Sequence, residues 1–433
     1  MRAYQTLTKG ELEEELRTLR AAYELWRAQG RRLNMARGKP GAEQLALSMG
    51  LLDTLTSSSC YETESGIDCR NYGELLGIPE ARRLFGELLG VRPEEVIVMG
   101  SSSLTAMYDF AARAMLKGVL GSPEPWCRLG RVKFLCPVPG YDRHFSLCES
   151  LGIEMISVPM NGQGPDMDIV EKLAAEDETI KGIWCVPKFS NPTGSCYSDK
   201  TVRRLAAMPA KAGDFRIFWD DAYAVHYVYE DAEVLNILRA CEEAGNPNRP
   251  YWFGSTSKIT FPGAGVAFFA ASEENIQFTA KQLAAEAISW DKLNMLRHVR
   301  FFQNAQGIRA QMDRHAAILR PRFDAVLEAL EFSLSGTGAG SWLKPKGGYF
   351  ITYMAEPGCA KRIVSLCREA GLTLTEAGAT HPYHQDPDDA YIRIAPSFPS
   401  LEDLRAAMEI FCVCAKIAAA EKLLRTAKEG AST

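Results

Sequence analysis

Short apolar runs alternate with helix-forming stretches through the middle of this chain, and this alternation is the feature that most restricts its fold. The runs stand at residues 96–99, 132–136, 151–159, 182–187, 217–219, 251–253 and 266–270. Strands that alternate with helices predict a mostly parallel, doubly wound α/β sheet. Ligands of such sheets bind at the carboxyl ends of the strands. We therefore expect the functional side chains just after these runs.

Chemically versatile side chains do follow several of the runs. Lys258 is the most informative, because it ends Ser255-Thr256-Ser257-Lys258 between two apolar runs. Lysine is rarely buried without a partner or a function, and burial lowers its pKa. A neutral amine is what Schiff-base chemistry requires. The alternative is an ordinary lysine in a surface loop. The other side chains at run ends are Ser102, Tyr141, Asn191 and Asp220.

Three motifs occur in a fixed order along the chain. They are Asn191-Pro192-Thr193-Gly194, then Asp220-Asp221-Ala222-Tyr223, then Ser255-Thr256-Ser257-Lys258. Together they resemble the fold-type I pyridoxal-phosphate (PLP) aminotransferases of the aspartate aminotransferase superfamily. The form Lys258-Ile259-Thr260 followed by Pro262-Gly263-Ala264-Gly265 is similar to a divergent bacterial aspartate aminotransferase branch. The resemblance extends from Gly38 to the region of Arg393.

The resemblance implies the fold of a PLP-dependent transferase of type I. A large domain with a mostly parallel sheet is expected at residues 51–310. A smaller α+β domain is expected from both termini, at residues 1–50 and 311–433. The pattern predicts strands of this domain at 346–351 and 391–395, and its closing helices at 401–427. The resemblance also implies a homodimer with shared active sites.

The resemblance implies pyridoxal 5′-phosphate as the cofactor and gives Lys258 the central role. Its amine is expected to form the imine and to carry out a 1,3-proton transfer during transamination. Asp220 is expected at the pyridine nitrogen, while Asp221 should point the opposite way on the strand, as a helix cap or a solvated group. Tyr141 is expected to stack on the ring, with His144 behind it in a structural role. The other expected cofactor contacts are Ser101, Ser102, Ser103, Ser255, Asn191, Tyr223 and, from the neighbouring subunit, Tyr72.

The phosphate site can also be argued from the residues alone. Gly100 and three serines follow the run 96–99 and precede a helical stretch at 104–116. The first amides of a helix have no partner within it and attract anions, although one serine could simply cap the helix. Many relatives carry an arginine shortly after the lysine, whereas this chain has Pro262-Gly263-Ala264-Gly265 there. The phosphate charge must then be met by amides, hydroxyls or a distant basic group.

The substrate is expected to contact Gly38, Asn191 and Arg393, with a plain turn as the alternative for Gly38. Arg393, in Tyr-Ile-Arg-Ile-Ala, matches the arginine that pairs with the substrate α-carboxylate. The alternative for Arg393 is a surface arginine on an edge strand. The cation for a distal carboxylate stays open among Lys39, Lys292 and Arg297.

The predicted function is transamination of aspartate with 2-oxoglutarate as acceptor. The alternatives are a PLP-dependent lyase, or an aminotransferase for an aromatic amino acid or alanine, on the same fold. An aminotransferase-like transcription regulator is disfavoured because too few residues precede Gly38 for a winged-helix domain. A Rossmann-type dehydrogenase is disfavoured because no GxGxxG follows the first strand.

Composition excludes other classes of protein. A net charge of -5 and a pI near 5.9 argue against a nucleic-acid binder. The twelve cysteines include no CxxC pair, so we expect free thiols in the cytoplasm and no metal site. No apolar run approaches the roughly 20 residues that span a membrane, and no charged-then-apolar leader is present.

Overall fold

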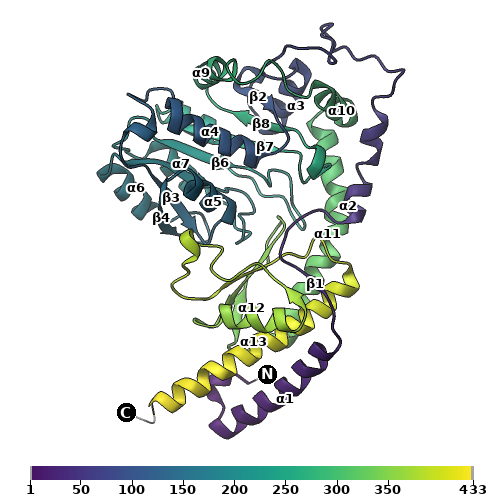
Figure 1. Cartoon of the computed structure of the whole chain (residues 1–433), viewed down its shortest axis with the longest axis vertical. Coiled ribbons are helices and arrows are strands. Elements are labelled where there is room, and N and C mark those ends of the chain that lie inside the picture. The colour runs from purple at the N-terminus through teal and green to yellow at the C-terminus, as the bar shows by residue number, and fades with distance from the viewer. Residues whose placement is uncertain (1, 431–433) are drawn as a thin grey trace.

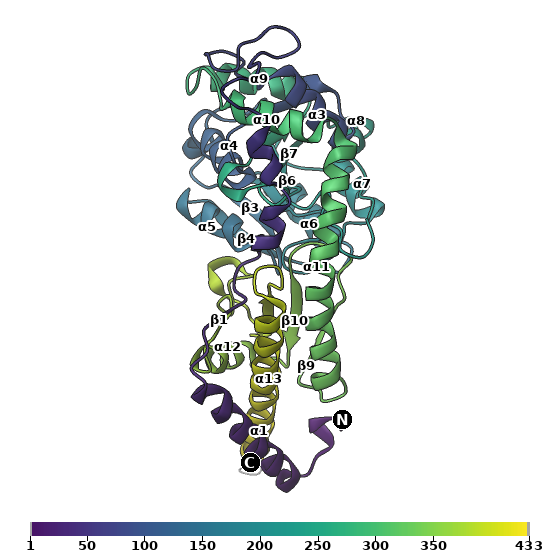
Figure 2. The same ribbon diagram turned by 90° about the vertical axis from the view of Figure 1, so that its right-hand side faces the viewer.

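The computed structural model describes residues 2–430, and these form two parts connected by one long helix and by the N-terminal segment that follows residue 34. The larger part holds a seven-stranded sheet covered by helices, and the smaller part lies below it in Figure 1. Helix α11 (Ala305–Leu334) runs along the side of both parts (Figure 2). None of the helices within residues 2–430 is long and apolar enough to cross a membrane.

The sheet has the mostly parallel order that the alternating runs predict. Its strands lie in the order β2 (Val96–Met99), β8 (Ala267–Ala270), β7 (Pro250–Ser255), β6 (Arg216–Asp220), β5 (Ile180–Cys185), β3 (Lys133–Val138) and β4 (Glu154–Pro159). Only β8 is antiparallel to its neighbours. The connection from β7 to β8 is too short for a crossover helix, so the strand must reverse direction. The lysine of interest lies in this connection.

Helices cover both faces of the sheet and bury alternate side chains of each strand. On β2, Ile97 packs into the core beneath α4, whereas Val98 packs with Phe85 of α3 on the other face. The helices of this part are α3 (Pro79–Leu89), α4 (Ser103–Lys117), α5 (Asp142–Ser150), α6 (Met167–Glu176), α7 (Asp199–Ala207), α8 (Ile237–Glu243), α9 (Glu273–Leu283) and α10 (Lys292–Phe302).

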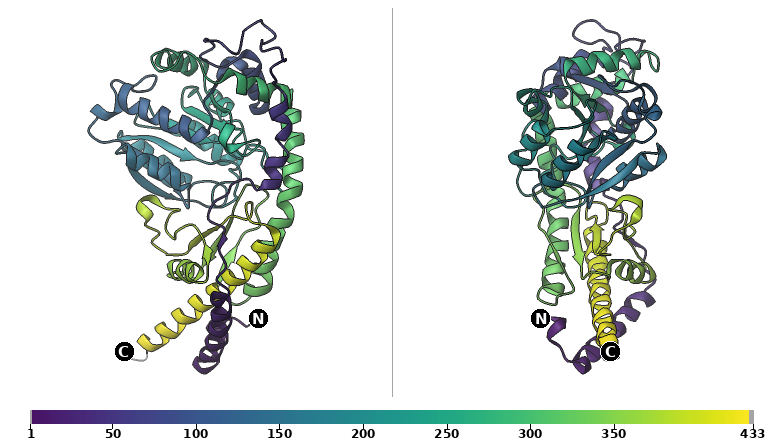
Figure 3. Two further views of the ribbon diagram at one scale, coloured as in Figure 1. Left: turned by 45° about the vertical axis from the view of Figure 1, so that its right-hand side comes forward. Right: turned by 90° about the vertical axis from the view of Figure 1, so that its left-hand side faces the viewer.

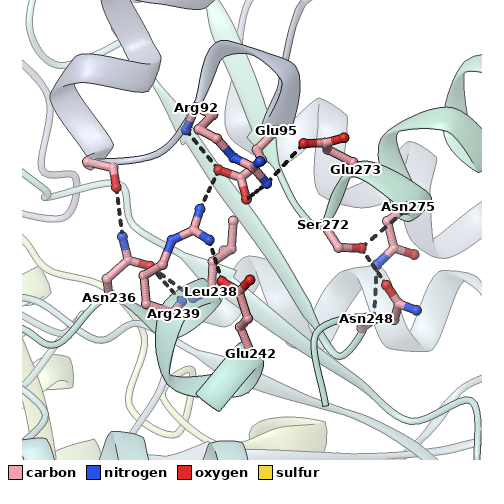
Figure 4. A network of polar contacts seen from close by, with 11 residues as sticks. Arg92, Glu95, Asn236, Leu238, Arg239, Glu242, Asn248, Ser272, Glu273 and Asn275 are labelled. Carbon is pink, nitrogen blue, oxygen red and sulfur yellow. Dashed lines mark hydrogen bonds and ion pairs between the residues drawn. The ribbon is translucent and has the colours of Figure 1, made fainter. Parts of the chain in front are cut away.

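A network of ion pairs fixes the start of β2 against neighbouring helices (Figure 4). The buried Glu95 carboxylate accepts hydrogen bonds from the Arg92 backbone at 2.8 Å and from the Arg239 guanidinium of α8. Arg92 also pairs with Glu273 of α9 at 2.9 Å. A buried carboxylate needs such partners to offset its lost hydration. The network therefore anchors the strand that leads into Ser101.

The smaller part is built from both ends of the described chain. Helix α1 (Lys9–Ala28) packs on α13 (Leu401–Gly430), as the views in Figure 3 show, and Arg20 pairs with Glu421 at 2.6 Å. One hydrophobic core unites the two ends, with Tyr23, Phe323 and Phe411 among its members. The remaining elements here are α2 (Ala42–Ala46), α12 (Ala360–Glu369), the antiparallel sheet of β9 (Gly340–Trp342), β10 (Ile351–Ala355) and β12 (Tyr391–Ile394), and the parallel pair β1 (Leu33–Asn34) and β11 (Leu372–Thr373).

Two expectations about this part need correction. A strand was expected at 346–351, but β10 begins only at Ile351. The backbone of Lys346 instead accepts hydrogen bonds from Val228 and Tyr229 of the larger part, so it cannot pair in the small sheet. The closing helices expected at 401–427 form one helix. The domain boundaries at 50/51 and 310/311 stay a prediction, and α11 runs across the second of them.

Candidate active site

A cavity of about 470 Å³ lies between the carboxyl ends of the sheet strands and the smaller part. Six of the predicted site residues line it, and they come from both parts of the chain. Its lining residues are Ala36, Arg37, Gly38, Lys39, Tyr141, Asp142, Arg143, Asn191, Tyr223, Lys258, Phe350, Leu374, Thr375, Glu376 and Arg393. Ser101, Ser102, Ser103, Ser255 and Asp220 are not among them.

Lys258 projects from the loop between β7 and β8. Its Nζ lies 5.1 Å from the ring centre of Tyr223. Burial is the main effect on the Lys258 pKa and lowers it, Asp220 opposes the shift, and Arg393 adds to it. Because a lowered pKa increases the neutral fraction of the amine, this environment favours a nucleophilic lysine.

Asp220 ends β6 with one carboxylate oxygen engaged and one free. Its Oδ2 lies 3.0 Å from His144 Nε2, while Oδ1 is buried and has no partner within the described residues. A buried unpartnered carboxylate oxygen is costly, so a ligand atom that donates or carries a positive charge would stabilise it. A protonated pyridine nitrogen has this chemistry.

His144 was expected to have only a structural role, but it contacts Asp220 directly. Its ring stacks on Trp184 at 4.4 Å and presents Nε2 to Asp220. Tyr141 precedes α5 and His144 lies in the first turn of that helix, so the three-residue spacing places both on one face. This three-residue spacing from Tyr141 is the sequence feature from which the position of His144 at the site could have been predicted.

Asp221 points to the opposite face of the sheet, as the strand alternation predicts. The expectation that it caps a helix or is solvated was wrong, because it is buried and accepts a hydrogen bond from Trp252 Nε1 at 3.2 Å. Burial raises the pKa of Asp221 to about 6, and Lys188 opposes the shift.

The predicted phosphate end lies where α4 meets the Lys258 loop. Ser102 is the N-cap of α4, and its hydroxyl accepts from the Thr105 backbone at 3.2 Å. Ser257 Oγ donates to the Ser101 carbonyl at 3.2 Å, and Ser255 Oγ donates to Ser257 Oγ at 3.0 Å. The capping role and the anion role are compatible, since one serine caps the helix while the others lie nearby.

Gly265 lies where the loop after Lys258 closes on the segment that leads into α4. A Cβ at Gly265 would lie 2.6 Å from the Ser101 carbonyl and 3.1 Å from Ser257 Oγ. Asn294 of α10 holds the Ala264 and Gly265 carbonyls at 3.0 and 3.1 Å. The backbone thus closes tightly on α4, and a side chain at Gly265 has no space.

Arg393, on β12 of the smaller part, also lines the cavity. Its Nη1 donates to Asn191 Oδ1 at 3.0 Å and to Asp142 Oδ1 at 2.9 Å, and its Nη2 donates to Thr375 Oγ1 at 3.3 Å. The Asn191-Pro192 peptide is cis. The guanidinium carbon lies 4.7 Å from the ring centre of Phe350. The contacts with Asp142 and Thr375 were missed, because nothing in the sequence places these segments together.

Gly38 lies beside Phe350, the aromatic residue next to Arg393. A Cβ there would be 2.6 Å from Cζ of Phe350, so the glycine leaves space for the ring that supports Arg393.

Of the cations considered for a distal carboxylate, only Lys39 lines the cavity. Arg37 and Arg143 also line it and were overlooked. Lys292 is buried and donates its Nζ to the Tyr72 carbonyl at 3.0 Å. Tyr72 itself is 76% exposed and does not line this chain's cavity. Its role at the phosphate of a neighbouring subunit stays a prediction.

Comparisons with known proteins agree with this geometry. The family model described as aspartate amino-transferase matches residues 7–427. A protein of Mycolicibacterium smegmatis named a putative aminotransferase is 48% identical over 98% of this chain and 99% of its own length. An aspartate aminotransferase of Corynebacterium glutamicum is 46% identical over 90% of each chain. The crystal structure of an aspartate transaminase from C. glutamicum superposes with a TM-score of 0.94 at 43% identity, covering 97% of this chain and 99% of that one.

Proposed function

Because the chain belongs to the aspartate aminotransferase family, whose fold-type I members depend on PLP, we propose that it transfers the amino group of aspartate to 2-oxoglutarate. The observation that carries this proposal is one cavity lined by both Lys258 and Arg393, with Asp220 near enough to raise the pKa of Lys258 against the effect of burial. An amine, a carboxylate and a guanidinium thus converge on one site. They are the groups that an amino-acid aminotransferase requires.

Each end of the site has a proposed task. Bound PLP supplies the ring that withdraws electrons from the substrate Cα. The free Oδ1 of Asp220 would hold the ring nitrogen in its protonated form, while His144 holds the other oxygen in place. Hydroxyls and amides at Ser101, Ser102, Ser103 and Ser255 meet the phosphate. Tyr141 would hold the face of the ring, and Asn191 and Tyr223 would donate hydrogen bonds to the cofactor's phenolic oxygen; all three line the cavity.

Lys258 moves the proton. Its Nζ would take the proton from the substrate Cα as a base and then give it back as an acid, which completes the 1,3-proton transfer. Arg393 holds the α-carboxylate as a two-point pair, which orients the Cα–H bond toward Lys258. Gly38 and Asn191 complete the substrate contacts at that end.

The preference for a dicarboxylic amino acid rests on charge at the cavity mouth. Arg37, Lys39 and Arg143 line the cavity in addition to Lys258 and Arg393. Only two acidic side chains, Asp142 and Glu376, line it. This excess of positive charge suits a substrate with a second carboxylate, in agreement with the names of the two Corynebacterium glutamicum proteins.

We further propose a cytoplasmic homodimer in which Tyr72 reaches the partner's phosphate. All twelve cysteines are free thiols, which suits a reducing compartment. The exposure of Tyr72 away from its own cavity suits a contact across the dimer.

The test is a panel of amino donors against 2-oxoglutarate with purified holoenzyme. Aspartate is expected to give the largest kcat/KM, and aromatic amino acids and alanine are expected to be poorer donors. Release of ammonia without an acceptor acid would instead indicate a lyase. Absence of bound PLP, and failure to take it up, would reject the proposal.

A further inference from the structure

Asp142 places a carboxylate of the protein itself at the guanidinium that the substrate requires. We propose that Asp142 occupies the α-carboxylate position on Arg393 in the ligand-free enzyme and must leave when an amino acid or 2-oxo acid binds. The inference rests on the proposed role of Arg393 in the transaminase reaction. It makes Asp142 a residue that sets the affinity for every carboxylate ligand.

The hydrogen bonds of Arg393 leave few donors for a ligand. Nη1 already donates to Asp142 and Asn191, and Nη2 donates to Thr375. Nε has no partner within the described residues, but it is buried, so a ligand in the cavity does not reach it. A carboxylate that enters must therefore approach the Nη edge. There, the oxygen of Asp142 lies 2.9 Å from Nη1.

A two-point carboxylate pair at this edge requires Asp142 to move. The Arg393 side chain is 7% exposed and that of Asp142 is 28% exposed. The arginine is thus held inside the protein while the aspartate faces the cavity. Asp142 is the first residue of α5. The free amides at this helix end favour a negative charge, so the Asp142 carboxylate stays stabilised when its side chain rotates away from Arg393. Arg143 and Lys39 line the same cavity and can receive the released carboxylate.

Two properties follow from this exchange. While the cavity has no ligand, the buried guanidinium keeps an ionic partner, which spares the cost of an unpaired buried charge. A ligand gains from Arg393 only if it carries an anionic group that replaces Asp142. Amines that lack a carboxylate obtain no such gain, so the contact selects for α-carboxylates at the expense of affinity.

The test compares Asp142→Asn and Asp142→Ala with the wild-type holoenzyme. Binding of succinate and of butyrate, which have no amino group to react, is followed by the absorbance of the bound cofactor. Both variants are expected to bind both acids about tenfold more tightly, the factor that corresponds to one displaced charge-assisted hydrogen bond. KM for aspartate is expected to fall by a similar factor, and kcat is expected to change much less.

Glu376→Gln is the matched comparison, because it removes the same charge from the same cavity without an Arg393 contact among the described residues. The Glu376 side chain is 76% exposed and pairs with Arg368, so its charge is screened by water and the variant is expected to tighten acid binding by no more than about twofold. If Asp142→Asn and Asp142→Ala bind the acids equally or more weakly than wild type, Asp142 positions Arg393 rather than competing for it, and the inference is wrong.

Arg393→Lys separates this result from the proposed function. If this variant weakens acid binding while the Asp142 variants do not tighten it, only the Asp142 inference fails. If Arg393→Lys leaves acid binding unchanged, the carboxylate role of Arg393 fails, and the inference fails with it.

Discussion

The two ends of the cavity are built in different ways. The proposed cofactor end comes from loops at the carboxyl ends of three strands of one sheet, β2, β6 and β7, around Ser101, Asp220 and Lys258. The carboxylate end combines segments from across the chain, since Arg393 contacts Asp142, Asn191 and Thr375. Local backbone thus sets the first end, and the packing of the two parts sets the second. Replacing a functional group should therefore have its main effect at the first end, and removing an ion pair or hydrogen bond should have its main effect at the second.

The largest effect is expected at the amine. Lys258→Ala should lower kcat with aspartate by about a thousandfold or more, because positioned acid–base catalysis contributes factors of that order. Single-turnover absorbance measurements would show it. Lys281→Ala, an exposed lysine on α9, is the control. Turnover of Lys258→Ala within tenfold of wild type would reject the proposed chemistry.

Asp220→Asn should lower kcat by about a hundredfold. The variant keeps the shape of the side chain but loses a charge, and a charge pair at about 4 Å contributes up to about 4 kcal/mol before its desolvation is subtracted. Steady-state kinetics at saturating cofactor measures the loss. Asp221→Asn next door points away from the cavity and should stay within about twofold. Equal losses in the two variants would contradict the assignment of Asp220.

Asp221 offers a test in stability rather than activity. Because burial raises its pKa to about 6, the folded protein holds a proton that the unfolded chain releases at lower pH. Wild-type stability from this group is thus lost as pH rises from about 4 to about 6. Asp221→Asn lacks this loss. The difference in free energy of unfolding, variant minus wild type, should therefore increase by about 2 kcal/mol from pH 4.5 to pH 7. Denaturant unfolding of both proteins checks this, and parallel pH profiles would contradict it.

The smallest effect is expected in the loop at Gly265. Gly265→Ala should weaken PLP binding by about tenfold, because its Cβ would press on the Ser101 carbonyl, and overpacking of this kind costs about 1–3 kcal/mol. The cofactor dissociation constant measures it. Gly263→Ala is the matched control, since nothing lies within 4 Å of its added Cβ. If Gly265→Ala binds PLP as Gly263→Ala does, the tight closure does not matter for the cofactor.

The difference between the two ends also explains what sequence reasoning could find. The sheet and the residues at its strand ends were predictable because each follows an apolar run within a few residues. The pairing of His144 with Asp220 was within reach from its spacing to Tyr141. The Asp142–Arg393 pair was not, because the two residues lie far apart in the chain and only packing unites them. Asp221 was placed on the correct face, but its burial depends on Trp252, which sequence alternation does not reveal.

The packing of α1 on α13 has a consequence for how the polypeptide matures. Residues near the amino end, such as Arg20 and Tyr23, find their partners at Glu421 and at the Leu366 carbonyl. During translation, α1 must therefore wait for α13 to emerge from the ribosome, whereas the strands of the large sheet have met well before that. A nascent chain interrupted before α13 would leave the apolar face of α1, with Leu12, Leu19 and Tyr23, unprotected, which is the kind of surface that chaperones bind.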